Sequence, residues 1–123
     1  MEEKIKVKEI IEIPEGKHNG VIDDVVRREV ESDKGIFDYT DIHIDLVDLK
    51  DTPTIKMGFP TTISELSTLG QFLKSSGMDF KTNDEFTIID ILSHLKGKKL
   101  SFQTYNDSNH FAVIVKDTVK FVK

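Results

Sequence analysis

The stretch that decides the fold is KHNGVIDDVVRREV, residues 17–30. It is rich in β-branched residues, which favour strands. Its alternation of polar and apolar residues is interrupted at Gly20 and again at the apolar pair Val25-Val26. A β-bulge or a sharp bend accounts for both interruptions. The stretch therefore predicts one long, bent strand.

The residues that follow extend this strand into a sheet. Residues 32–35, SDKG, predict a hairpin loop in which glycine supplies the unusual dihedral angle. Residues 39–47 predict a second strand and residues 54–59 a short third one, with a loop between them. Alternation places Ile42, Ile44 and Leu46 on one face of the second strand, and Ile55, Met57 and Phe59 on one face of the third.

A helical region is expected next. Thr61 or Thr62 is predicted to cap a helix that stops at Gly77. Helical spacing gives this helix four core residues: Leu66, Leu69, Phe72 and Leu73. A second helix is predicted over residues 87–95, closed by Gly97.

Two strands finish the chain, over residues 99–105 and 111–122, with an interruption of the second at Lys116-Asp117. Five phenylalanines are in phase with apolar neighbours and are predicted to be core: Phe59, Phe72, Phe102, Phe111 and Phe121. Short loops between strands favour antiparallel pairing in a mostly-β α+β domain.

The order of the elements predicts a fold class. Three strands, a helical insert and two strands are the order of an OB-like, five- to six-stranded antiparallel barrel with the insert between strands 3 and 4. A β-sandwich, or an open sheet with helices on one face, would give the same pattern. The chain of 123 residues is one domain, 1–123, in which residues 1–13 are an extra strand or an arm.

Composition limits the compartment and the partners. With no cysteine, disulfides and thiolate metal sites are excluded. The sequence has no signal-peptide core and no membrane-span stretch of roughly 20 apolar residues. We expect a cytoplasmic protein without a membrane partner. A net charge of −5 argues against coating duplex DNA by bulk electrostatics, although a local basic groove is compatible with it.

Catalytic motifs are absent from the sequence, which has no phosphate-binding glycine loop, nucleophile elbow or HExxH. Asp41, His43 and Asp45 share one face of the second strand and could hold Mg²⁺ or Mn²⁺ for phosphodiester hydrolysis. Alternation alone also explains them as the solvent face of that strand, which we favour. We therefore predict no enzyme activity, no catalytic residue, no metal and no cofactor.

Cations and out-of-phase rings indicate a surface for single-stranded nucleic acid, because such surfaces combine phosphate contacts with stacking platforms. The candidate nucleic-acid-binding residues are Arg27, Arg28, Tyr39, Lys56, Lys98, Lys99, Tyr105 and His110. One observation opposes this hypothesis. Asp41 and Asp45 fall on the face of Tyr39, where they would repel phosphate.

Four segments carry a resemblance to a known group: PEGKHNGVIDDVVRRE, YTDIHIDLVD, LGQFLKSSG and LKGKKLSFQTYND. Across residues 13–115 the pattern resembles the small OB-fold single-stranded-DNA-binding proteins of phages of Gram-positive hosts and related prokaryotic elements. The resemblance implies sequence-tolerant binding of single strands through a barrel face, and often self-association. The chain ends in VKFVK rather than in the acidic tail that many bacterial single-strand binders use to recruit partners.

Three functions therefore follow from the sequence. The first is non-catalytic binding of single-stranded nucleic acid, DNA by resemblance. The second is a protein-interaction or assembly module that pairs sheet edges, through the apolar segments 1–13 and 119–122. The third is a metal-dependent phosphodiesterase. Oligomeric state and the choice between DNA and RNA stay open.

Overall fold

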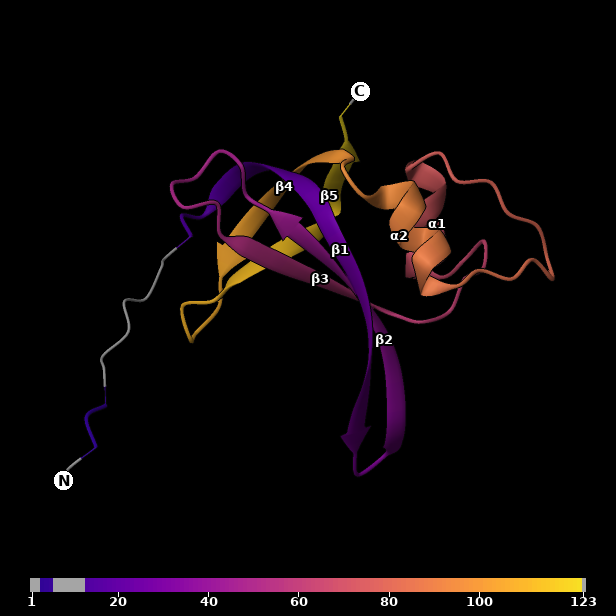
Figure 1. Cartoon of the computed structure of the whole chain (residues 1–123), viewed down its shortest axis with the longest axis horizontal. Coiled ribbons are helices and arrows are strands. Elements are labelled where there is room, and N and C mark those ends of the chain that lie inside the picture. Colours follow the sequence, from indigo (N-terminus) through magenta and orange to yellow (C-terminus); the bar gives the residue numbers. More distant parts are fainter. Residues whose placement is uncertain (1–2, 6–12, 123) are drawn as a thin grey trace.

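The computed structural model describes residues 3–5 and 13–122. In chain order the elements are β1 (Gly16–Ser32), β2 (Gly35–Asp45), β3 (Thr54–Pro60), α1 (Thr68–Ser75), α2 (Ile88–Leu95), β4 (Lys99–Asn106) and β5 (Ala112–Phe121). Each of the four strand pairings is antiparallel, and both helices lie between β3 and β4 (Figure 1). The expected mostly-β α+β class with a helical insert is confirmed.

The long strand β1 organises the sheet. Its first part pairs with β4, its second part pairs with β2, and the full strand order is β3-β2-β1-β4-β5. Gly20 is required where the two parts meet, because a Cβ there would lie 2.3 Å from Ile44 Cγ2. The bulge lies between Ile22 and Asp24 rather than at Val25-Val26. Val25 is buried and Val26 exposed, as in an ordinary alternating strand.

Beyond the core, β1 and β2 continue as a two-stranded arm that projects away from the rest of the sheet (Figure 1). We define the arm as residues 26–41; at its base, residues 39–41 also pair with β3. It closes in the expected tight turn at residues 33–34, followed by Gly35 at φ +122°. Phe37, which precedes the second strand expected at residues 39–47, lies inside β2 and is paired with Val30.

The expected closed barrel is not formed, since β3 and β5 are the two ends of the described sheet and do not pair. Side chains bridge the gap between them. The Phe72 ring of α1 lies 5.2 Å from the ring of Phe59 on β3 and 5.2 Å from that of Phe121 on β5. Across the same gap, Lys116 Nζ donates to the Gly58 carbonyl at 2.5 Å. These contacts replace the backbone ladder that would close a barrel.

The core lies between the inner face of the curved sheet and the helices. Its buried residues come from all the described strands and helices and from the segment after β2: Ile22, Val25, Ile42, Ile44, Leu46, Ile55, Met57, Phe59, Leu69, Phe72, Leu73, Ile91, Leu95, Leu100, Phe102 and Ile114. Phe111 was predicted to belong to it and is exposed instead, because it precedes β5 in the β4–β5 loop.

The first helix starts later than expected. Ser67, not Thr61 or Thr62, is its N-cap, and its hydroxyl accepts from the Gly70 amide. Leu66 therefore precedes the helix and is exposed. Ser67 is favoured as the N-cap because its hydroxyl also accepts from the amide of Ser64, which fixes the preceding turn.

The second helix begins as expected at Thr87, in a capping box with Asp90. Among the described residues, neither helix combines the length and apolar character needed to cross a membrane. The predicted extra strand or arm at residues 1–13 falls largely on positions 1–2 and 6–12, outside the described residues. Residues 3–5 carry no strand.

Candidate nucleic-acid interface

The sheet has an outer face that the core does not cover. On β2 this face carries the odd-numbered side chains, because Ile42 and Ile44 face the core. Directly opposite residues of neighbouring strands share a face. The register therefore places Arg28 of β1, Tyr39 of β2 and Lys56 of β3 on the outer face. Three of the predicted nucleic-acid-binding residues thus share one face, and two of them, Arg28 and Tyr39, are directly paired.

Arg28 is the centre of this group. Its Nε donates to Asp41 Oδ2 at 2.5 Å, and its guanidinium carbon lies 5.1 Å from the centroid of the Tyr39 ring. Gly58, paired with Asp41, leaves room for the ion pair, since a Cβ there would lie 2.8 Å from Asp41 Oδ1. Arg28, Tyr39, Asp41 and Gly58 form a unit that we call the stacked cluster.

The stacked cluster removes the part of the electrostatic objection that concerns Asp41, while Asp45 keeps its charge on this face. The Asp41 side chain is only 8% exposed and its charge is balanced by Arg28. Asp45 accepts a hydrogen bond from the Thr54 hydroxyl at 2.8 Å. The expectation that Asp41 faces solvent was wrong, because a residue on an outer face can still be covered by a long side chain from the next strand.

Arg27 lies on the opposite face of the arm. It makes a two-pronged ion pair with Asp38, with Nε at 2.9 and 2.8 Å from the two carboxylate oxygens. These hydrogen bonds lower the pKa of Asp38 and raise that of Arg27. Arg27 therefore does not join the stacked cluster.

A metal site at Asp41, His43 and Asp45 is not assembled. Within residues 3–5 and 13–122, no group of three or more His, Cys, Asp or Glu side chains is placed to hold a metal ion. Asp41 instead contacts Arg28, and His43 is paired across the sheet with Lys56. The geometry gives the phosphodiesterase hypothesis no support.

The remaining predicted residues lie elsewhere. Lys99 and Tyr105 are exposed residues of β4 on its outward-facing positions, close to opposite ends of that strand. Lys98 is half-buried in the turn before β4. His110 is exposed in the β4–β5 loop at φ +64°, and its amide donates to the Asp107 carbonyl. Neither Lys98 nor His110 belongs to the stacked cluster.

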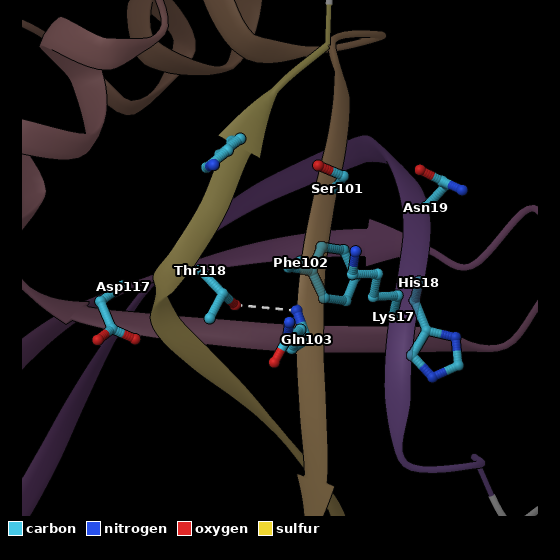
Figure 2. A pocket seen from close by; sticks show the side chains of 9 residues that line it. Lys17, His18, Asn19, Ser101, Phe102, Gln103, Asp117 and Thr118 are labelled. Carbon is cyan, nitrogen blue, oxygen red and sulfur yellow. Dashed lines mark hydrogen bonds between the residues drawn. The ribbon is translucent and has the colours of Figure 1, made fainter.

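A second feature of the outer face was not recognised from the sequence. A groove of about 460 Å³ crosses β1, β4 and β5 (Figure 2). We call it the β4 groove, and it is lined by Lys17, His18, Asn19, Ser101, Phe102, Gln103, Asp117, Thr118 and Lys120. Figure 2 shows Lys17 extending from β1 toward β4, whereas Asp117 is directed away from β4.

Alternation in residues 99–105 already placed Ser101 and Gln103 on one face. It could not place Lys17 or Lys120 beside them. Those neighbours follow from the pairings Lys17↔Gln103 and Ser101↔Lys120, which join segments far apart in the chain.

Comparisons with known proteins do not place this chain in a family. A scan against models of protein families finds no match, and a search of curated proteins finds none either. The functional argument therefore rests on the residues and their geometry.

Proposed function

We propose that this protein binds single-stranded nucleic acid, DNA in the first instance, without sequence preference and without catalysis. The observation that carries the proposal is the stacked cluster, in which the Arg28 guanidinium lies against the Tyr39 ring on a projecting arm. Bases stack on aromatic rings and on arginine planes, and every base offers such a face.

The apolar surroundings of the cluster support stacking. Val26 and Phe37 are exposed on the arm, and the register puts both on the face of Tyr39. A two-stranded hairpin has little core of its own and is marginally stable in water. A nucleic-acid strand lying along this face would cover the exposed Phe37 ring and the half-buried Tyr39 ring and stabilise the arm.

The outer face carries cations that can contact phosphate, together with the carboxylates of Asp24 and Asp45. Asp41 is balanced by Arg28. Lys56, Lys99 and Lys17 lie on outward positions, and none is in an ion pair within the part of the chain that the structure describes. A local field of this kind can attract a polyanion even though the net charge is −5.

The fold proposed for this function is an OB-like barrel opened between β3 and β5. Two features support it: β1 pairs with both β2 and β4, and the helical insert lies between β3 and β4. The resemblance to small OB-fold single-stranded-DNA-binding proteins belongs to the same proposal.

The test is fluorescence anisotropy with a labelled dT oligonucleotide of about 20 nucleotides, at low and physiological salt, with a duplex control. We expect saturable binding that weakens as salt rises. Tyr39→Ala should weaken binding about 5- to 150-fold, the equivalent of about 1–3 kcal/mol per stacked base. Tyr39→Phe, which keeps the ring, is the matched control.

Absence of binding at low salt would end the proposal. Equal binding by wild type and Tyr39→Ala would move the interface away from the arm.

A second candidate, an assembly module, is favoured by a different observation. The β3 and β5 edges of the described sheet are unpaired, and Ile36 near the arm tip is 67% exposed. Edges of this kind can pair with another chain. This candidate predicts a defined oligomer by sedimentation and no oligonucleotide binding.

A further inference from the structure

We propose that the β4 groove is a second phosphate-binding site, which holds the backbone of the same single strand that stacks on the arm. The inference rests on the proposed function. It assigns a role to Lys17 and Lys120, which form no part of the stacked cluster.

An irregularity in the sheet builds the groove. Ser101 pairs with Lys120 and Gln103 pairs with Val115, so residues 116–119 of β5 oppose the single residue Phe102 of β4. This excess of chain moves β5 away from β4.

The opening is held in place by Thr118. Its hydroxyl accepts from the Gln103 amide at 2.9 Å and donates to the Val115 carbonyl at 2.6 Å (Figure 2). Backbone groups left without a ladder partner are thereby satisfied. The groove is therefore a fixed feature of the sheet rather than a gap between loose strands.

The lining chemistry suits a phosphodiester. Lys17 and Lys120 come from strands on either side of β4, and the register puts neutral donors, Asn19 and Gln103, beside Lys17. Lysine binds phosphate as a point charge, and amide and hydroxyl groups donate to phosphate oxygens. No ion pair engages Lys17 or Lys120 in the described residues.

Base stacking is not expected in this groove. Phe102, the lining residue with a phenyl ring, is 2% exposed and belongs to the core. Contacts there would be to backbone phosphate and sugar, which position a strand without reading its sequence. A volume of about 460 Å³ is within the usual range of ligand sites.

Strand β1 connects the two sites, because Lys17 and Arg28 both point outward from it. At about 3.3 Å per residue, the eleven steps between them measure at most about 36 Å along the bent strand. A short oligonucleotide on the arm would not reach the groove, whereas a longer one would.

The experiment compares two double variants that remove the same charge. Lys17→Gln/Lys120→Gln changes the groove, and Lys50→Gln/Lys81→Gln changes exposed loop lysines that do not line it. Each is titrated with dT oligonucleotides of about 5 and about 20 nucleotides over a range of salt. All four lysines are exposed, so we expect unchanged thermal stability.

For the long oligonucleotide, the plot of log K against log salt has a negative slope. In the groove variant this slope should be less steep by about 1.4, because each phosphate contact on a single strand contributes about 0.7. The loop variant should match the wild type. Both variants should bind the short oligonucleotide as the wild type does.

Equal slopes for the groove and loop variants, with intact wild-type binding, would overturn the inference and leave the proposed function standing. If the wild type binds no oligonucleotide, both the inference and the proposed function are overturned. A thermal shift with dTMP or inorganic phosphate that depends on Lys17 and Lys120, without oligonucleotide binding, would overturn the nucleic-acid assignment and give the groove to a free phosphate ester.

Discussion

At the scale of single residues, the stability of the arm depends on how its two arginines are paired. Arg28 is half exposed, but its partner Asp41 is 8% exposed; Arg27 is 58% exposed and its partner Asp38 is 30% exposed. Removing one partner of a covered pair leaves a desolvated charge, whereas an exposed pair contributes little. Two adjacent arginines should therefore differ in their effect on stability.

The prediction compares Arg28→Ala with Arg27→Ala. Arg28→Ala should lower the free energy of unfolding by about 1–3 kcal/mol, because Asp41 is left without its donor. Arg27→Ala should cost clearly less, because its pair with Asp38 is exposed to solvent. Urea denaturation measures both. Equal costs for the two variants would contradict the prediction, and Arg28→Ala/Asp41→Ala should recover part of the loss.

Gly20 gives a second prediction at this scale. In Gly20→Ala the new methyl would lie 2.3 Å from Ile44 Cγ2 and 3.3 Å from Phe102 Cε1, both core side chains. Overpacking of this kind costs about 1–3 kcal/mol. Asn19→Ala, exposed on the same strand, is the control and should stay within about 0.5 kcal/mol. If Gly20→Ala left the stability to thermal or urea unfolding unchanged, the sheet would be able to bend to accept the methyl.

At the scale of elements, the two helices depend on caps and on each other. Each is eight residues long, too short to be stable in isolation. The C-cap residue Ser76 of α1 is hydrogen-bonded to His94 Nε2 of α2 at 2.9 Å. In Figure 1 the helices lie together beside the sheet. A change in the charge of His94 should therefore affect both helices.

The pH prediction concerns His94. Its burial, and then the nearby Lys98, lower its pKa below the ordinary 6.5. The unfolded chain then binds a proton at His94 more readily than the folded chain does. The folded state therefore loses stability as pH falls below 6.5. His94→Gln cannot titrate and should lose less stability than the wild type between about pH 7.5 and 5.5 in urea denaturation. Parallel pH profiles for the two proteins would contradict this.

The cap of α2 provides a prediction on a single element. Thr87→Ala removes the hydroxyl that accepts from the Asp90 amide and should cost about 1 kcal/mol. Thr87→Ser keeps the oxygen and should be close to neutral. Chemical denaturation of the pair tests the cap, and equal losses would point to the lost methyl instead.

At the scale of the whole molecule, the open side between β3 and β5 is held by side chains. Lys116 of β5 donates to the Gly58 carbonyl of β3 and lies 4.7 Å from the centroid of the Phe59 ring. Beside it, a cleft of about 320 Å³ runs between these strands and α1. This side should open more readily than the paired centre of the sheet.

Lys116→Ala should therefore act locally. We expect a loss of about 1–2 kcal/mol from the hydrogen bond and the cation–π contact. Amide hydrogen exchange should become faster in β3 and β5 than in the paired centre of the sheet. Lys120→Ala, on the same strand but facing the groove, should leave exchange unchanged. Uniform acceleration across the sheet would show that the bridge stabilises the whole fold rather than one side.

The order of the elements, the hairpin at residues 33–34 and the helix ends at Gly77 and Gly97 were all determined by the sequence. These features depend on interactions within a few residues: alternation, turn chemistry and left-handed glycines at φ +94° and +85°. The three candidate site residues that the structure groups, Arg28, Tyr39 and Lys56, could likewise be found from strands that neighbour each other in the chain.

Only the tertiary structure decided the bulge before Asp24, the burial of Asp41, the open side of the sheet and the β4 groove. Each depends on register or on contacts between distant segments. Gly16 pairs with Thr104, for example, and Phe72 lies between the rings of Phe59 and Phe121. A periodic pattern shows which side chains share a face of their own strand, but it holds no information about which strand lies beside it.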